Sequence, residues 1–476
     1  MALDVPAATA RTAATWRDDI EARLHEYIAV PALSVAFDPD WEAHGHLDRV
    51  VADAAGWATT RVIAGLEVEV VRLPGRTPVL WFSVPAFGDA APTDDQVLLY
   101  GHLDKQPPME GWRDGLGPWT PVEIDGRLYG RGGADDGYAA YASLAALEAI
   151  QAHGGSHAHC VGLIETSEES GSPDLPAYVE HLADRLDPSL VVCLDSFCGD
   201  YERLWTTTSL RGLLSGTLTV EVLTEGIHSG SASGVAPDSF RLARRLLDRV
   251  EDPDTGAVLV PELHAAVPPG REAELAAVAA DLGAALTASY PYVTGAGPQI
   301  PDAEAAAQLR AKTWEPTLTI TGADGLPPTA SAGNVLRPRT TLALSFRLPP
   351  TVDADVAARA VVDVLTADPP HGARVVVDID SAEGGWDAPA TAPWLAAATE
   401  AASMATFGTP ARSLGEGGSI PFLGMLGRRF EQAQFLLTGV LGPGSNAHGP
   451  NEFLHLPTAR SLTAAVALVI DAHARR

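Results

Sequence analysis

Residues 95–104 read DQVLLYGHLD, a short apolar run that ends on a histidine and an aspartate. A run of Val, Leu and Tyr without polar alternation is typical of a strand buried on both faces of a parallel sheet. Two further stretches share the pattern, HCVGLIE at 159–165 and LVVCL at 190–194. A helical pattern at 137–153 lies between the first strand and the second. Apolar strands that alternate with helices predict an α/β layer architecture.

The rest of the chain changes character at about residue 206. Before it, helices are predicted at 16–29 and 41–64, and strands at 68–72 and 79–84. After it, strands with polar and apolar alternation are predicted at 216–223, 317–321, 340–346 and 374–379, with helices at 237–251 and 271–286. The last part has helices at 393–407 and 456–473 and a strand at 434–438. We therefore predict a catalytic α/β domain of residues 1–206 and 384–476, with a smaller α+β domain of residues 207–383 inserted in it.

Composition excludes several classes of protein. The chain has 476 residues, and 32 Lys+Arg against 61 Asp+Glu give a net charge of −29, which disfavours nucleic acid and anionic membranes as partners. Lys105 and Lys312 are its two lysines, so Schiff-base chemistry is disfavoured. Three cysteines do not form a disulfide framework and suit a reducing compartment. Without a secretory signal or an apolar run of about 18 residues, we expect a cytoplasmic protein.

Histidines and acids gather where the predicted strands end. They lie in GHLD, GADDG, ETSEES, CLDS and NAHGP, and the residues are His102, Asp104, Asp135, Asp136, Glu168, Glu169, Asp195 and His448. Ligand sites in open α/β sheets form beyond the carboxyl ends of strands, and histidine with carboxylates suits a site for two divalent cations. Taken singly, each has a structural explanation: a polar turn, a helix N-cap or a solvated loop. Their common position at one sheet edge favours the metal site.

Seven segments between about residues 97 and 452 carry a family pattern. They are VLLYGHLDKQPP, DGRLYGRGGADDG, LIETSEESGS, VVCLDS, GIHSGSASG, EGGSIP and GSNAHGPNE. Through them the chain resembles the dinuclear zinc metallopeptidases that include aminoacylases, glutamate carboxypeptidases and dipeptidases, in the carnosinase-like dipeptidase branch. The resemblance implies a zinc-peptidase-like catalytic domain with a mixed sheet flanked by helices. It also implies that the inserted domain is a lid through which a homodimer forms.

The resemblance implies two divalent ions per chain. Asp135 is expected to bridge them, while His102 and Asp195 complete one metal position and Glu169 and His448 complete the other. Zn²⁺ is the first choice, and Mn²⁺ and Co²⁺ are the alternatives, because sites of His and carboxylate accept all three.

Further roles follow from the same resemblance. Glu168 is expected to be the general base that activates a water bridging the metals, and Asp104 to orient the ring of His102. His228 is expected to stabilise the oxyanion in the active site of the partner subunit. The residues expected to hold the substrate are Asn334, Arg347, Gly417, Gly418 and Ser419. Two plain structural alternatives stay open here: a loop histidine for His228 and a surface arginine for Arg347.

One segment departs from the family pattern. Many relatives place a lysine soon after the bridging aspartate, whereas this chain reads Asp135-Asp136-Gly137-Tyr138. The departure bears on substrate preference, since no metal ligand is lost.

Three functional hypotheses result. The first is a metal-dependent hydrolase that cleaves the amide bond of a dipeptide or similar small substrate with a free carboxylate. The second is an aminoacylase or specialised amidase that cleaves or forms N-acyl amino acids. The third is a non-catalytic binding protein on the same fold, which the presence of every expected ligand and of the base disfavours.

Overall fold

The computed structural model describes residues 2–89, 95–418 and 421–476. The chain folds into two compact units, which we call unit 1 and unit 2. Unit 1 comprises Met1–Thr208, Ala388–Leu414 and Met425–Arg476, and unit 2 comprises Ser209–Asp387 and Gly415–Gly424. The short segment Gly415–Gly424 thus groups with unit 2, although the sequence analysis placed it in the catalytic domain.

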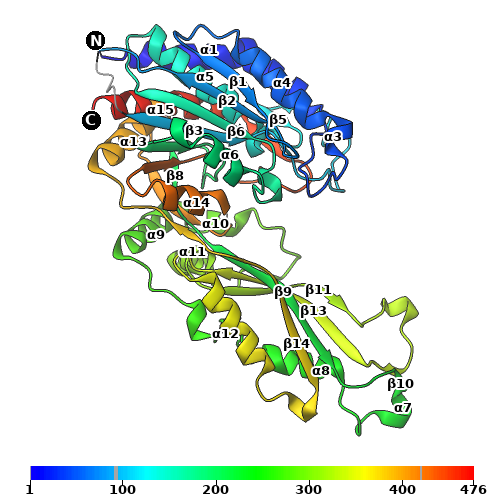
Figure 1. Ribbon diagram of the computed structural model, residues 1–476. Coiled ribbons are helices and arrows are strands. Elements are labelled where there is room, and N and C mark those ends of the chain that lie inside the picture. The colour runs from blue at the N-terminus through cyan, green and yellow to red at the C-terminus, as the bar shows by residue number, and fades with distance from the viewer. Residues whose placement is uncertain (1, 90–94, 419–420) are drawn as a thin grey trace. The chain divides into compact units, whose positions relative to one another are not determined.

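A six-stranded mixed sheet forms the centre of unit 1 (Figure 1). Its strands are, in spatial order, β1 (Glu67–Val71), β2 (Val79–Val84), β6 (His159–Glu165), β3 (Gln96–His102), β7 (Leu190–Cys193) and β17 (Gln434–Leu437). The pairs β6–β3, β3–β7 and β7–β17 are parallel, while β1–β2 and β2–β6 are antiparallel. Every residue of β3 is buried, as its unbroken apolar run predicts. The predicted α/β class with a mixed sheet is confirmed.

Helices cover this sheet. They are α1 (Val5–Thr15), α2 (Glu21–Ile28), α3 (Trp41–His44), α4 (His46–Ala58), α5 (Ala139–Ala152), α6 (Leu175–His181), α13 (Pro393–Thr406) and α15 (Leu456–Ala474). Figure 1 shows α4 running along β1 and β2, and α15 lies beside both α5 and α13. The alanine-rich α5 is buried over almost its whole length, because small side chains let neighbouring helices and β3 approach closely. Among the described residues, none of the helices is long and apolar enough to cross a membrane.

The chain also forms two small three-stranded sheets. In one, β18 (Phe453–His455) pairs with β5 (Arg127–Tyr129), which pairs with β4 (Val122–Ile124). Because Phe453 lies opposite Tyr129, this sheet brings the chain near residue 450 alongside the chain near residue 130. The other sheet has the order β15 (Trp386–Asp387), β8 (Trp205–Leu210) and β16 (Arg412–Glu416), and α14 (Pro421–Arg429) follows it.

Unit 2 is built on a four-stranded antiparallel sheet. Its spatial order is β11 (Thr317–Asp324), β13 (Arg339–Leu348), β9 (Gly212–Glu221) and β14 (Arg374–Glu383). Burial alternates along β9 and β13, as their alternating sequences predict. Both α8 (Ser239–Leu247) and α12 (Ala354–Thr366) pack on the sheet. The remaining elements are α7 (Ser229–Ala232), α9 (Pro269–Leu282), α10 (Ala285–Ala288), α11 (Ala305–Thr313), β10 (Ile227–His228) and β12 (Val335–Leu336).

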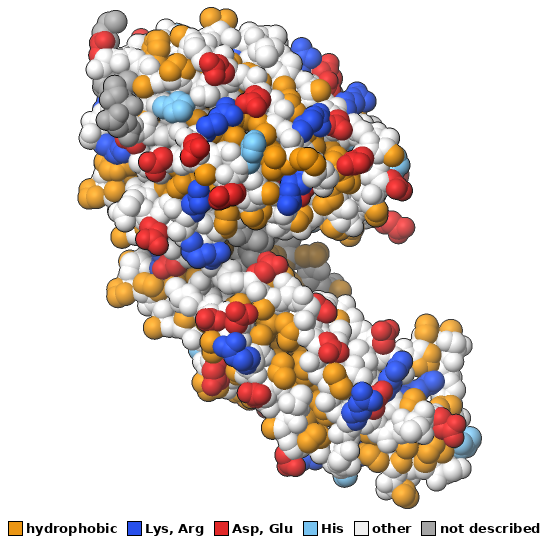
Figure 2. Space-filling view, viewed as in Figure 1, with side chains coloured by type: hydrophobic (Ala, Val, Ile, Leu, Met, Phe, Trp, Pro, Cys, Tyr) orange, Lys and Arg blue, Asp and Glu red, His pale blue; other side chains and the backbone are white. Residues whose placement is uncertain are grey.

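Some predicted elements differ from the structure. The helix predicted at 41–64 is two helices, because Gly45 adopts a φ of 68° between α3 and α4. The sequence analysis missed α1, α6, α11, α12 and α14. On the face that Figure 2 shows, acidic and basic side chains are interspersed over both units.

Candidate active site

The parallel register places several predicted site residues at one edge of the sheet in unit 1. His102 is the last residue of β3 and lies opposite Glu165, the last residue of β6. A short turn, Glu168–Ser170, follows β6, and Asp195 lies two residues beyond β7. Since β6, β3 and β7 are parallel neighbours, their carboxyl ends deliver these side chains to one place.

The structure brings all five predicted metal ligands together in two groups. One group is His102, Asp135 and Asp195, and the other is Asp135, Glu169 and His448; within each, the ligand atoms lie within 4.8 Å of one another. Asp135 belongs to both groups, because its Oδ1 lies 3.4 Å from His102 Nε2 and its Oδ2 lies 3.0 Å from His448 Nε2. One carboxylate therefore presents an oxygen to each group.

The chemistry of these atoms fits divalent cations. Among the described residues, the buried atoms His102 Nε2 and Glu169 Oε1 have no hydrogen-bond partner. Leaving such atoms unpaired away from water costs free energy, unless something else binds them. Imidazole nitrogens and carboxylate oxygens are ligands that zinc and related cations accept.

The pKa shifts show how much negative charge this edge concentrates. Burial raises the pKa of Glu168 well above its ordinary value, and the charge of Asp195 adds to the effect. Burial works to lower the pKa of His448, but hydrogen bonds to Asp135 and Glu169 outweigh it and raise that pKa to about 11. Positive charge is thus strongly favoured between these carboxylates, as a cation site requires.

Asp104 holds the turn that carries the two glutamates. This buried carboxylate accepts hydrogen bonds from the backbone N–H of Glu168, at 3.1 Å, and of Glu169, at 3.0 Å. His102 Nδ1 lies 3.1 Å from the main-chain oxygen of Asp104 and 3.4 Å from its Oδ1. The main chain is therefore the closer partner of the ring, whereas the expectation from the resemblance gave that part to the carboxylate.

The adjacent glutamates face different ligand groups. Glu168 Oε2 lies 4.0 Å from His102 Nε2, while Glu169 Oε2 lies 3.2 Å from His448 Nε2. One can therefore bind metal while the other remains available as a base, as the sequence analysis proposed. Sequence reasoning missed Gln106, whose Nε2 donates to Glu169 Oε2 at 2.7 Å. Its position two residues after Asp104 was the available signal.

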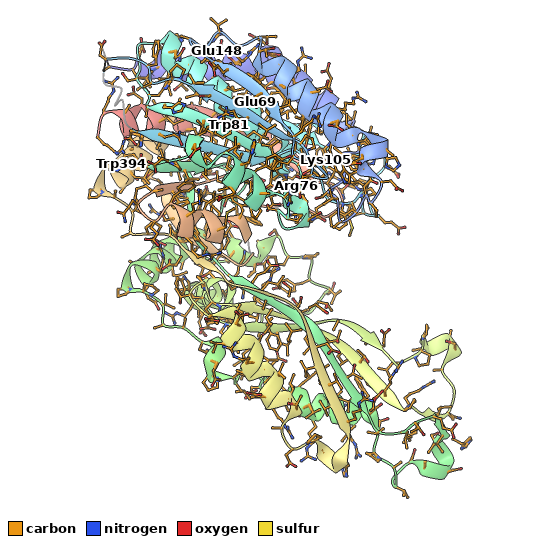
Figure 3. The ribbon with its side chains drawn as sticks, in the orientation of Figure 1. Glu69, Arg76, Trp81, Lys105, Glu148 and Trp394 are labelled. Atoms are coloured by element: carbon orange, nitrogen blue, oxygen red, sulfur yellow. The ribbon has the colours of Figure 1, made fainter. Side chains whose placement is uncertain are left out.

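The structure shows what occupies the space beside Gly137, in the segment that lacks the lysine found in many relatives. A Cβ on Gly137 would lie 2.1 Å from Cε1 of Tyr27, so the tyrosine ring fills the space of a side chain there. The ammonium of Lys105 lies 3.9 Å from the centre of the same ring and donates to the main-chain oxygens of Tyr27 and Val30. A lysine thus enters this part of unit 1 from position 105, which Figure 3 labels.

The other predicted residues belong to unit 2. His228 is exposed on β10, and its Nδ1 accepts a hydrogen bond from the backbone N–H of Gly230 at 3.1 Å. The pairing of β10 with β12 and the hydrogen bond from Ser229 N to Asn334 O bring His228 and Asn334 together. Their predicted roles at the reaction centre remain predictions.

Arg347 and the glycine pair lie elsewhere in unit 2. Arg347 is partly buried on β13 opposite Thr317 of β11, and burial lowers its pKa. The backbone oxygen of Gly417 accepts a hydrogen bond from Nε of Arg211 at 3.2 Å. Gly418 follows it, and Ser419 lies outside the described residues. The part predicted for these residues in substrate binding remains a prediction.

Comparisons with known proteins agree with this arrangement. The model of peptidase family M20/M25/M40 matches residues 98–472, a span that includes every predicted metal ligand. The chain is 28% identical over 418 residues to the cysteinylglycine-S-conjugate dipeptidase of Corynebacterium striatum, which covers 84% of this chain and 85% of the relative. It is 28% identical over 266 residues to the Beta-Ala-His dipeptidase of Homo sapiens, which covers 54% of this chain and 52% of the relative.

Solved structures share the fold. Human carnosine dipeptidase 1 superposes with a TM-score of 0.78 at 23% sequence identity, covering 99% of each chain. A dipeptidase of Saccharomyces cerevisiae superposes with a TM-score of 0.76 at 20% identity, covering 100% of each chain. The resemblance that the sequence motifs indicated is confirmed.

Proposed function

Because the chain belongs to peptidase family M20/M25/M40 and is a metal-dependent peptidase, we propose that it cleaves the amide bond of a dipeptide or similar small substrate with a free carboxylate. The observation that carries this proposal is the pair of ligand groups that share Asp135. Dipeptides are the first choice because a relative that aligns over most of both chains is a dipeptidase of cysteinylglycine conjugates. Aminoacylase or amidase activity, and a non-catalytic binding role, have no observation that favours them over this choice.

We propose two divalent cations per chain, Zn²⁺ first, with Mn²⁺ or Co²⁺ as alternatives. His102 and Asp195 would hold one, Glu169 and His448 the other, and Asp135 both. When bound, such cations polarise a substrate carbonyl and lower the pKa of a water toward neutrality.

Glu168 is proposed as the general base. Its carboxylate is partly buried near His102 without belonging to either ligand group, and burial raises its pKa. A carboxylate with a raised pKa can accept a proton from the attacking water and return it to the leaving amine. Asp104 supports this role by fixing the backbone of the turn through two hydrogen bonds.

Unit 2 is proposed to supply substrate contacts. A guanidinium such as that of Arg347 suits the free carboxylate, and His228 with Asn334 suits a developing oxyanion. Gly417, Gly418 and Ser419 would offer backbone N–H groups to the same carboxylate. We further propose that residues 207–383 act as lid and dimerisation domain of a cytoplasmic homodimer, in which His228 completes the partner's site, and that nucleic acid and membranes are not partners.

A substrate screen tests the proposal. Purified protein supplied separately with Zn²⁺, Mn²⁺ and Co²⁺ should hydrolyse Cys-Gly or β-Ala-His faster than N-acetyl amino acids. Metal analysis should give close to two ions per chain, and Glu168→Gln should retain both while losing turnover. Preference for N-acyl amino acids would favour the amidase hypothesis, and full activity of Glu168→Gln would show that Glu168 is not the base.

A further inference from the structure

A buried ion pair lies outside the ligand set. The guanidinium of Arg131 is 1% exposed and its Nη1 donates to Oε2 of Glu452, which is fully buried. The two residues are 321 positions apart in sequence, in the segments GRGG and GPNE. Removing two charges from water is costly, and replacing such pairs with apolar residues is often neutral for stability. Stability alone therefore does not explain why this position holds a buried ion pair.

Arg131 contacts two loops that carry site residues. Its Nη2 donates to the backbone oxygen of Gly449, the residue after His448, at 2.9 Å. Its Nε donates to the backbone oxygen of Pro107 at 3.2 Å, and Pro107 follows Gln106, the side chain that holds Glu169. A guanidinium can serve these three acceptors at once because its donors form a rigid, planar fork.

Glu452 contacts the segment that leads to Asp135. Its Oε1 accepts a hydrogen bond from the backbone N–H of Gly132 at 2.8 Å, and its main-chain oxygen accepts one from Gly130 N at 3.0 Å. Gly130 has a φ of 145° and Gly132 a φ of 82°, conformations that residues with a Cβ rarely adopt. The two glycines thus let Arg131 point at Glu452 from between them.

The loop that carries His448 depends on contacts of this kind. His448 has a φ of 64° and Asn451 a φ of 62°, both unfavourable for residues with a Cβ. Such conformations persist only where the surrounding structure holds them. The hydrogen bonds from Arg131 to Gly449 and from Gly130 and Gly132 to Glu452 hold this loop from both sides.

We propose that Arg131 and Glu452 are positioning residues for one of the two metal positions, the one formed by Asp135, Glu169 and His448. The pair acts on His448 through the backbone of Gly449 and on Asp135 through the backbone of Gly132. It acts on Glu169 through Pro107 and the side chain of Gln106. This inference rests on the two-metal arrangement of the proposed function. The other position shares Asp135, but its remaining ligands, His102 and Asp195, lie at or just beyond the ends of buried parallel strands that the pair does not contact, so it should depend less on the pair.

The test is Glu452→Gln, a nearly isosteric change. The amide oxygen can still accept from Gly132 N, but the new amide N–H group faces a guanidinium that also only donates. Titration of the metal-free protein with Zn²⁺, and with Co²⁺ followed by absorption, should show one ion weakened by about 10- to 100-fold, the magnitude typical of residues that support metal ligands. The other ion, which shares only Asp135 with this position, should be weakened much less.

Two further variants sharpen the result. Arg131→Lys keeps the charge but loses the fork, and should weaken the same ion; it also carries the test if Glu452→Gln does not fold. Glu148→Gln is the matched control, since this buried carboxylate accepts a hydrogen bond from Arg11 at 2.5 Å and lies well apart from Lys105 in Figure 3. It should leave both metal affinities unchanged.

A double variant identifies the ion concerned. In Glu452→Gln combined with His448→Ala, the remaining ion, compared with His448→Ala alone, should lose much less affinity than the weakened ion loses in Glu452→Gln. Equal weakening of both ions, no weakening of either, or the same loss in Glu148→Gln would overturn the inference. If the wild type binds fewer than two ions, the two-metal proposal itself fails, which is a different result from unchanged binding in the variants.

Discussion

Replacing Asp104 by Asn would separate the two jobs that this residue can perform. The carboxylate accepts one backbone N–H on each oxygen, from Glu168 and from Glu169. An asparagine has one acceptor oxygen, so one of these two N–H groups would face the amide nitrogen, which donates. The ring of His102 would keep its closer partner, because that partner is the main-chain oxygen of residue 104 at 3.1 Å.

The magnitude follows from the hydrogen bond that is lost. A hydrogen bond to a charged group contributes about 1.5–3 kcal/mol, and the substitution removes at least one. If the turn shifts and the base moves with it, this free energy appears as a loss of roughly 10- to 150-fold in kcat/KM. The metal ion that we propose at His102 should keep its wild-type affinity.

The assay is dipeptide hydrolysis at saturating metal, together with metal analysis. Asp174→Asn is the control, because Asp174 also joins two loops, through Arg76 Nη1 at 2.8 Å and Thr77 N at 2.9 Å, but belongs to neither ligand group. It should lower stability and leave kcat/KM unchanged. Wild-type kcat/KM in Asp104→Asn would refute the reasoning, and loss of the ion at His102 would show that the carboxylate acts on the ring after all.

Further outcomes are expected from three other perturbations. Burial, with the charge of Arg476, lowers the pKa of His473 to about 4, below its usual 6.5, so the unfolded chain binds the proton more readily between these values. Above pH 6.5, His473 is neutral in both states and the free energy of unfolding is at its full value; at pH 5 it is lower by about 2 kcal/mol because the unfolded chain binds the proton. Urea unfolding of His473→Gln should lack this part of the pH dependence. Gly137→Lys should cost about 1–3 kcal/mol because its Cβ meets the ring of Tyr27, and the double variant with Tyr27→Ala should lose less stability in thermal unfolding than the two single variants summed. A chelator should abolish hydrolysis and lower the melting temperature, and added Zn²⁺ or Co²⁺ should restore both. A melting temperature that does not change with the chelator would contradict metal binding by the folded chain.

The central sheet could be predicted from sequence because its strands are buried on both faces. The apolar runs within β3, β6 and β7 are continuous, and each leads to an ionisable residue at or just beyond the carboxyl end of its strand. These residues are His102, Glu165 and Asp195. Family motifs then predicted the metal ligands, and the structure brings these side chains together in two groups. Local patterns therefore sufficed wherever one strand or turn determines where a side chain lies.

Other features depended on partners remote in sequence. Arg131 and Glu452 meet only where β18 pairs with β5. Because they are 321 positions apart, no local sequence pattern predicts their contact. The role of the Asp104 carboxylate likewise depends on which way the turn after β6 presents its backbone N–H groups. The helix α12 was missed because its sequence, ADVAARAVVDVLT, is rich in valine, whose branched side chain favours strands over helices.

The order of strands has a consequence for synthesis of the chain. β7 ends at Cys193, but its second neighbour β17 begins only at Gln434, after all of the strands of the unit 2 sheet. At roughly 5–20 residues per second, the intervening stretch takes the ribosome on the order of ten to fifty seconds. During that time one edge of a buried, apolar strand has no partner, which is a hazard for aggregation. Slower translation of this stretch, or weaker folding of unit 2, would thus harm the yield of a sheet to which unit 2 contributes no strand.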